Sequence, residues 1–179
     1  MKKIVIMGYG ELGRDIISKY AGAYDVQVYD PAKGYGAEIA TGKDVLNVCI
    51  DYSKFFIEEV SKAISDGEPK LTVIHSTVPV GTTDALLKRV VTGTSIVYAP
   101  KIKDIKYIGA DTMPGIQAAM AHLGPLGYTV KLFSSSRLME LSTTLIRAKI
   151  DALQKWEEGV AEAAKAEGIP PDMLAEIIS

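Results

Sequence analysis

The residues with the clearest chemical potential are three glycines near the N-terminus. The run Gly8-Tyr9-Gly10-Glu11-Leu12-Gly13 directly follows an apolar, β-branched segment and opens an amphipathic one. In a turn from strand to helix, the first glycine permits the tight bend and the second lets the backbone approach a pyrophosphate. The third lets the helix pack against the strand. Because a helix N-terminus offers unpaired N–H groups to an anion, this spacing predicts a dinucleotide site at residues 8–13.

An acidic side chain follows the second predicted strand. Asp30 comes directly after Val26–Tyr29 and about 20 residues beyond the glycines, where a carboxylate accepts hydrogen bonds from an adenosine ribose. A carboxylate repels the 2′-phosphate of NADP, and no arginine directly follows Asp30, so the sequence favours NAD over NADP. The alternative is that Asp30-Pro31 only turns the chain.

Hydroxyl and imidazole groups follow the fourth predicted strand, in the run His75-Ser76-Thr77-Val78-Pro79-Val80-Gly81-Thr82-Thr83. Loops at the carboxyl ends of parallel strands line the ligand site of an open α/β sheet, so Ser76 and Thr77 are expected to face the dinucleotide. His75 is a candidate proton-transfer group beside the nicotinamide. Structural roles compete with these, because Thr82 or Thr83 suits a helix N-cap and His75 suits a half-buried, hydrogen-bonded position.

Short apolar runs alternate with amphipathic segments over residues 1–133, a rhythm typical of βαβ units. We predict a Rossmann-like, doubly wound and mainly parallel sheet. Its strands are expected at Lys3–Met7, Val26–Tyr29, Val45–Cys49, Leu71–His75, Ser95–Tyr98 and Thr129–Phe133. The helices between them are expected at Glu11–Tyr20, Lys54–Ser65, Thr83–Val91 and Gly115–Leu123.

The pattern changes after Phe133. Ser136–Gly168 has no proline and carries apolar residues at helical spacing, which predicts one long helix, with a short helix to follow at Asp172–Ile178. A helix of about 30 residues spans about 45 Å, more than the width of a domain of this size, so part of its apolar stripe is expected to need a second copy of the chain. The predicted division is a cofactor domain, 1–133, and a dimerisation element, 134–179.

Composition argues against several other classes of protein. The 179 residues are 47% hydrophobic and 23% charged, as in a folded globular chain, and a net charge of −2 gives no basic face for nucleic acid. No apolar run suits a signal peptide or a membrane span, so we expect a cytoplasmic protein without membrane contact. The one cysteine, Cys49, is expected to be a buried thiol, and His75 with His122 make no metal site.

The run Ser76–Thr83, behind a strand, the Gly8-x-Gly10-x-x-Gly13 turn and a helix, resembles the UDP-glucose/GDP-mannose dehydrogenase family. The resemblance covers most of 1–168, because Leu126–Tyr128, Phe133–Ser135 and Glu140-Leu141 are similar to that family's path into its central, dimer-forming helix. It implies an NAD-dependent oxidoreductase that converts a nucleotide-sugar alcohol into a carboxylate in two hydride transfers. It also implies that Thr77 helps to position water and substrate.

Departures from the family pattern limit this transfer of roles. The family's catalytic cysteine lies in a C-terminal domain, whereas this chain has only Cys49, so the thioester chemistry is not expected here. In the family, the segment after the fifth strand resembles Asn-Pro-Glu-Phe-Leu-x-Glu-Gly, whereas Tyr98–Lys106 of this chain keeps neither glutamate. Asp104 could replace the second glutamate, or it could be part of a solvated turn. The family's central-helix lysine and asparagine have no match within Met139–Arg147.

Three functional hypotheses follow from these residues. The first is an NAD-dependent oxidoreductase acting on a small or partner-supplied substrate, with Thr77, His75 or Asp104 handling the proton that accompanies hydride transfer. The second is a module that senses NAD(H) or an adenine nucleotide without chemistry of its own. The third is one subunit of a split dehydrogenase whose catalytic domain is a separate polypeptide.

Overall fold

A computed structural model of the protein describes residues 2–36, 38–39, 41–91, 93–102, 105–170 and 173–174. The chain divides into two compact units, Met1–Thr143 and Thr144–Ser179. Most of the short helix predicted at Asp172–Ile178 lies outside the described residues, as does Asp104.

The first unit is built on an eight-stranded sheet. Its parallel part has the order β2 (Asp25–Tyr29), β1 (Lys3–Met7), β3 (Val45–Val48), β4 (Leu71–Ile74) and β5 (Ser95–Tyr98). Beyond β5 lies β7 (Ile105–Gly109), which pairs antiparallel with β5 and β6 (Lys101–Ile102) and parallel with β8 (Thr129–Phe133). Because the chain passes from β1 to β2 on one side and then to β3 on the other, the sheet has a topological switch point at β1.

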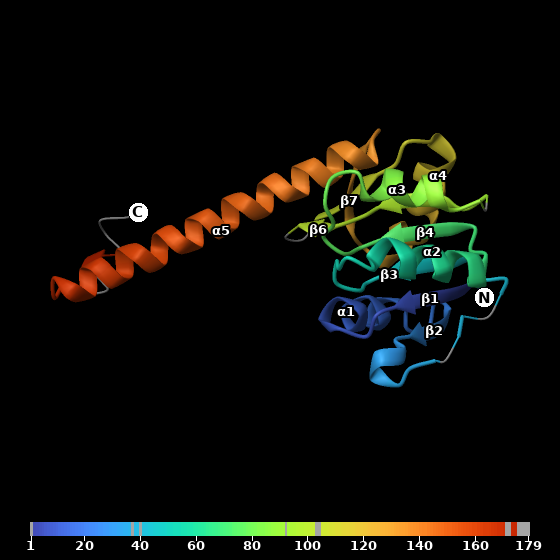
Figure 1. The fold of residues 1–179 in the computed structure, drawn as a ribbon, viewed down its shortest axis with the longest axis horizontal. Helices are drawn as coiled ribbons and strands as arrows, with labels where there is room; N and C mark the ends of the chain where they lie inside the picture. Colours follow the sequence, from blue (N-terminus) through green and yellow to red (C-terminus); the bar gives the residue numbers. More distant parts are fainter. Residues whose placement is uncertain are drawn as a thin grey trace. The chain divides into compact units, whose positions relative to one another are not determined.

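Helices cover both faces of the sheet (Figure 1). On one face, α1 (Glu11–Tyr20) and α4 (Met113–Leu123) bury Ile16, Tyr20, Ala119 and Leu123 in one apolar core. On the other face, α2 (Phe56–Gly67) and α3 (Thr82–Arg89) bury Phe56, Val60, Ile64 and Leu86 in a second core. Strand β1 serves both cores, because successive side chains of a strand point to opposite faces. The result is a three-layer α/β/α arrangement.

The long helix α5 spans Ser136–Ala166, 31 residues, and so has a length of about 46 Å. Its first turns belong to the first unit, where Met139 is buried in the core under α2 and α3. Within the second unit its large apolar side chains are about half exposed, namely Leu145, Ile150, Leu153 and Trp156. No helix in the described part of the chain has both the length and the apolar character needed to cross a membrane.

The predicted fold class is confirmed, and each predicted strand and helix within the described residues has its counterpart, with ends that agree to a residue or two. Cys49 is buried, as expected. Strands β6 and β7 were not predicted. No strand was expected between Tyr98 and Thr129, but Lys106 lies inside β7 and is 1% exposed. The alternation that marks a strand is hidden there, because a lysine occupies an inward-facing position beside Ile108.

Candidate functional site

Two of the three glycines in the turn after β1 are required by the fold itself. Gly8 has a φ of +103°, and a Cβ there would lie 2.9 Å from the carbonyl carbon of Cys49 and from Cγ2 of Ile50. A Cβ on Gly13 would lie only 2.0 Å from the carbonyl oxygen of Gly8. Neither position can accept a side chain, since the start of α1 packs directly onto the turn and onto the end of β3.

Gly10 is different, because the fold does not need it. Its backbone is extended, with a φ of −81°, and a Cβ there would meet no atom within 4 Å. Gly10 is also the N-cap residue of α1 and gives that helix no side-chain cap. The free space therefore lies against the positive end of a helix, where backbone N–H groups favour an anion. Glu11 is exposed and Leu12 half-buried in the first turn of this helix.

Asp30 lies beside this turn, at the end of β2. Its Oδ2 accepts a hydrogen bond from the backbone N–H of Tyr9 at 2.8 Å and lies 3.7 Å from Nζ of Lys33. Lys33 also donates to the carbonyl oxygen of Tyr9 at 3.1 Å, and the ring of Tyr35 lies 4.3 Å from that of Tyr9, centroid to centroid. The segment after β2 is thus held against the glycine turn, with the acid between them.

The Ser76–Thr83 loop leaves the same edge of the sheet. β4 is two strands from β1, so this loop begins about 10 Å from the glycine turn, on the side opposite to Asp30. Thr77 is exposed, whereas Ser76 is buried and donates to the carbonyl oxygen of Val48 at 3.4 Å. Of the predicted residues in this loop, Thr77 alone places its side chain within reach of solvent.

His75 belongs to a buried polar cluster that sequence reasoning did not find. Both histidines of the chain converge on Oδ1 of Asn47, with Nε2 of His75 at 2.9 Å and Nε2 of His122 at 3.1 Å. The hydroxyl of Tyr20 lies 3.2 Å from the same oxygen and 2.6 Å from Nε2 of His122. Nζ of Lys106 lies 2.7 Å from Nδ1 of His75. We call Tyr20, Asn47, His75, Lys106 and His122 the histidine cluster.

Burial determines the protonation of the histidine cluster. It lowers the pKa of Lys106 from its ordinary 10.5 to about 7, and the pKa of His122 to about 3. The pKa of His75 is also well below its usual range, first because of burial and then because of the neighbouring Lys106 charge. His75 is 4% exposed. Both imidazoles are therefore neutral at pH 7, and the role of His75 in proton transfer stays a prediction.

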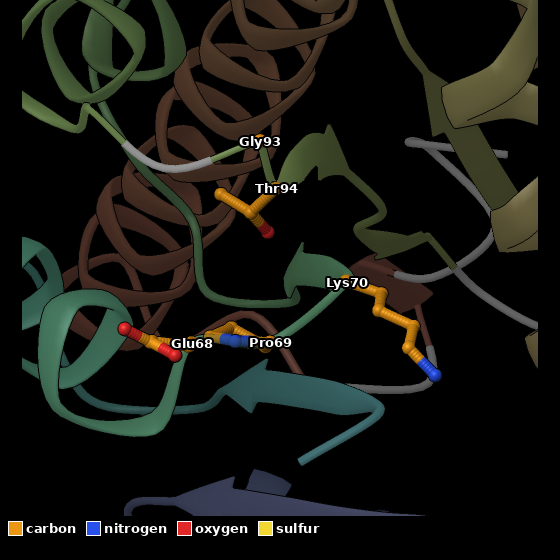
Figure 2. Close-up of a pocket in the computed structure, with 5 residues that line it drawn as sticks. All are labelled: Glu68, Pro69, Lys70, Gly93 and Thr94. Atoms are coloured by element: carbon orange, nitrogen blue, oxygen red, sulfur yellow. The ribbon is translucent and has the colours of Figure 1, made fainter. Parts of the chain in front are cut away.

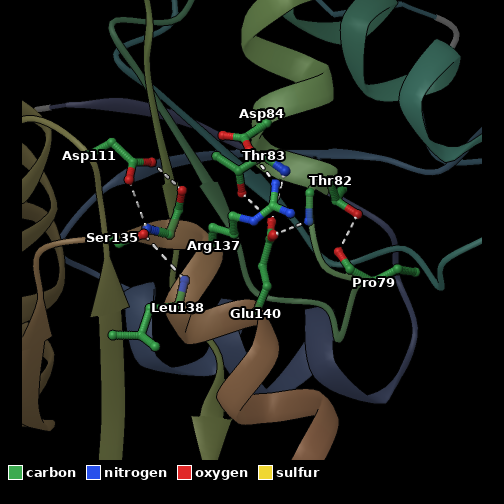
Figure 3. Close-up of polar contacts among 11 residues, drawn as sticks. Pro79, Thr82, Thr83, Asp84, Asp111, Ser135, Arg137, Leu138 and Glu140 are labelled. Atoms are coloured by element: carbon green, nitrogen blue, oxygen red, sulfur yellow. Dashed lines mark hydrogen bonds and ion pairs between the residues drawn. The ribbon is translucent and has the colours of Figure 1, made fainter.

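A second feature missed by sequence reasoning is Glu140, on the first turns of α5 (Figure 3). Its carboxylate is fully buried, with Oε2 accepting from Gly81 N–H at 2.6 Å and Oε1 accepting from Thr83 N–H at 2.8 Å and Thr83 Oγ1 at 2.6 Å. Glu140 therefore caps α3 from another helix. The prediction that Thr82 or Thr83 would cap α3 is replaced by this arrangement, because the side chain of Thr83 donates to Glu140 and that of Thr82 donates to Pro79 O.

Other parts of the described chain offer less chemistry. A hollow of about 350 Å³ is lined by Glu68, Pro69, Lys70, Gly93 and Thr94 (Figure 2). These residues precede β4 and β5, so the hollow lies at the amino edge, opposite the glycine turn. Within the residues that the structure describes, no three His, Cys, Asp or Glu side chains gather as a metal site would require.

No protein-family model and no curated protein matches the sequence. Solved structures do match. The chain is similar to the Mycobacterium tuberculosis 3-hydroxyisobutyrate dehydrogenase, with L-serine (TM-score 0.71, 18% identity), over 99% of this chain and 70% of that one. It is similar to the Pseudomonas aeruginosa GDP-mannose dehydrogenase in a ternary complex, with a TM-score of 0.71 and 14% identity, over 98% of this chain and 56% of that one. It is also similar to the Myxococcus stipitatus imine reductase in complex with NADP+, with a TM-score of 0.76 and 11% identity, over 98% of this chain and 70% of that one.

The chain thus spans between about half and seven-tenths of the solved structures that it matches. The resemblance to nucleotide-sugar dehydrogenases holds at the level of fold and extends equally to 3-hydroxyisobutyrate dehydrogenase and imine reductases. Identities of 11–18% show a shared fold alone. The protein has the Rossmann-like α/β fold of these dehydrogenases and reductases.

Proposed function

We propose that this protein binds a dinucleotide across the carboxyl edge of its sheet, with the pyrophosphate on the N-terminus of α1. The observation that carries the proposal is the contrast within the glycine turn. Gly8 and Gly13 are imposed by packing, but Gly10 faces open space at an uncapped helix end. A pyrophosphate explains that glycine, because its oxygens need backbone donors at a distance that a side chain would prevent.

The two halves of the ligand then extend in opposite directions from β1. The adenosine lies toward β2, where the carboxylate of Asp30 is held by Tyr9 N–H and accepts the ribose hydroxyls. The nicotinamide lies toward β4, beside Thr77 and the loop that follows it. Asp30 favours NAD over NADP, since a 2′-phosphate would come close to its negative charge.

An oxidoreductase activity is the first function that this arrangement supports, with Thr77 as the exposed hydroxyl beside the nicotinamide. The substrate would be small or supplied by a partner. A non-catalytic NAD(H)-sensing module is the second. The burial of His75 favours the module, because it leaves Thr77 as the one predicted proton-transfer side chain that is exposed among the described residues. Turnover with a panel of hydroxy acids, alcohols and sugar nucleotides separates the two.

The partner proposed for α5 is a second copy of the chain. Leu145, Leu153 and Trp156 are about half exposed and recur close to helical spacing, as expected for a helix face that pairs. Sedimentation equilibrium should give twice the chain mass of 19.3 kDa, and Leu153→Lys should shift the protein toward the single-chain mass. A wild-type protein that sediments as a single chain at all concentrations contradicts the dimer.

Calorimetric titration with NAD, NADH and NADP tests the dinucleotide site. We expect micromolar binding of NAD that Gly10→Val weakens by at least about 100-fold, because the side chain fills the space of the pyrophosphate. The matched control is Gly93→Val. A Cβ added at Gly93 also meets no atom within 4 Å, but Gly93 lies at the amino edge of the sheet, away from the glycine turn. Circular dichroism should show all three proteins folded. Absence of binding to any dinucleotide by the wild-type protein overturns the proposal.

A further inference from the structure

We propose that Glu140 is a positioning residue that holds the Ser76–Thr83 loop in the conformation that receives the nicotinamide half of the dinucleotide. The inference rests on the proposed function and adds a residue to it that lies on another element. Glu140 lies 59 residues after Gly81 and 57 after Thr83, so the sequence by itself does not place its carboxylate against the loop.

The geometry of the contact is that of a built acceptor site rather than a surface ion pair. The carboxylate is completely buried and accepts the three short hydrogen bonds from Gly81 and Thr83, at 2.6, 2.8 and 2.6 Å. Hydrogen bonds to an ionised acceptor are about twice as strong as neutral ones. Thr83 is itself fully buried, so its N–H and hydroxyl would have no access to water if the carboxylate moved away.

Glu140 can act as a fixed point because α5 is anchored independently of the loop. Asp111, which follows β7, accepts hydrogen bonds from both the backbone N–H and the hydroxyl of Ser136 at the start of α5. The ion pair of Arg137 with Asp84, 3.3 Å between guanidinium and carboxylate, instead joins the same turns of α5 to α3 and adds to the contact made by Glu140. Figure 3 shows these groups surrounding the first turn of α5, with Glu140 pointing at the start of α3.

The loop is therefore held at both ends, and the exposed residues lie between the two attachments. At one end, His75 N–H donates to Val48 O at 2.9 Å, and the side chain of Val78 is buried in the core. At the other end, Gly81, with a φ of +92°, is held by Glu140. Releasing the second attachment frees Pro79–Gly81 next to Thr77, the part of the loop that faces the nicotinamide in the proposed complex. The proposed adenosine and pyrophosphate positions follow β2 and β1, and β3 separates these strands from β4, which the loop follows.

The experiment compares NAD+ with ADP-ribose, which has the same adenosine and pyrophosphate but no nicotinamide. Glu140→Gln replaces one acceptor oxygen by an NH2 group, so a donor faces the N–H of Gly81 or of Thr83 and that hydrogen bond is lost. We expect this variant to bind NAD+ about tenfold more weakly than wild type and ADP-ribose within about twofold of wild type. Thr83→Val, which removes a single hydroxyl donor, should give a smaller loss in the same direction, and Thr83→Ser should restore NAD+ affinity.

The matched control is Asp111→Asn, which weakens the other carboxylate anchor at the start of α5 but leaves Glu140 in place. It should lower thermal stability without separating the two affinities. Equal weakening of both ligands by Glu140→Gln, or of neither, overturns the inference while leaving the proposed function intact. A wild-type protein that binds neither NAD+ nor ADP-ribose overturns the proposed function and this inference together.

Discussion

The glycine turn and the histidine cluster lie in the same unit, and both gather groups that can bind anions or exchange protons. They differ in what satisfies those groups. In the glycine turn, the N-terminus of α1 has no side-chain cap from Gly10, which faces open space. In the histidine cluster, Tyr20, His75 and His122 all lie within hydrogen-bond distance of Asn47, and Lys106 completes the group from β7.

The contrast teaches that residue type is a weaker guide to function than the presence of unused hydrogen-bonding capacity near solvent. The cluster holds the residue types most often associated with acid–base chemistry, yet its members bond to one another inside an apolar core. One buried atom in it, Nδ1 of His122, has no partner among the described residues. The glycine turn has no titratable group apart from Tyr9 and Glu11, yet its open space at Gly10 and the uncapped end of α1 are what the proposed dinucleotide site uses.

The largest expected effect concerns the charge of the cluster. Because the folded pKa of Lys106 is about 7 against an ordinary 10.5, the unfolded chain binds a proton in this window that the folded chain does not. The free energy of unfolding should therefore rise by about 1.4 kcal/mol per pH unit above pH 7 from this group, and this stability is lost as the pH falls toward 7. Urea unfolding at pH 7, 8 and 9 measures the slope.

Lys106→Met should remove that slope and make the protein more stable than wild type at pH 7, by an amount on the order of 3 kcal/mol. Lys131→Met is the control, because Lys131 lies on the neighbouring strand β8 but is exposed, so it should leave the slope unchanged. If Lys106→Met keeps the wild-type slope, the cluster is not the origin of the pH dependence.

The glycine turn provides the next effect, on stability alone. Gly13→Ala should lower the free energy of unfolding by about 3 kcal/mol, because its Cβ meets the Gly8 carbonyl and the backbone must shift. Gly10→Ala should change it by no more than about 0.5 kcal/mol, since the added methyl meets nothing. Urea unfolding measures both changes. An equal loss of unfolding free energy from the two substitutions would falsify the distinction between Gly13, which packing requires, and Gly10, which it does not.

Cofactor choice provides a smaller effect. Asp30→Ala should weaken NAD binding by about tenfold and leave NADP binding nearly unchanged, because the ribose loses its acceptor while the 2′-phosphate loses a repelling charge. Asp30→Asn is the matched variant, since it can still accept from Tyr9 N–H. The ratio of the two dissociation constants, obtained by calorimetry, is the measured quantity, and a ratio that does not move removes Asp30 from the site.

The smallest effect is expected at Lys33, which lies near Asp30 and partly offsets its charge. Lys33→Ala should increase the preference for NAD over NADP by about threefold, a modest change because the ammonium is half exposed and screened by solvent. Lys62→Ala serves as the control, since that lysine pairs with Asp66 on α2. A shift toward NADP in Lys33→Ala would mean that the lysine acts other than by offsetting Asp30.

Local patterns were enough to predict most of the fold, including the glycine turn between β1 and α1, while the ligand role of that turn stays a prediction. The glycine spacing, the β-branched runs and the apolar stripe of α5 are signals within short windows, and the structure has the corresponding elements. Glu140 and Lys106 could not be found in this way. Glu140 acts on Gly81 and Thr83 across a long sequence separation, and Lys106 sits in a strand whose inward positions include a charge. Both depend on tertiary contacts that no spacing rule encodes.

The chain has one tryptophan, and it lies on the part of α5 that belongs to the second unit. Trp156 is half exposed there, whereas Tyr20 and Tyr98 are fully buried in the first unit. Tryptophan fluorescence therefore follows the second unit, while the near-ultraviolet dichroism of the tyrosines is weighted toward the first. Two coincident denaturation curves would identify a single cooperative transition, and two separated curves would give each unit its own melting point from one unlabelled sample.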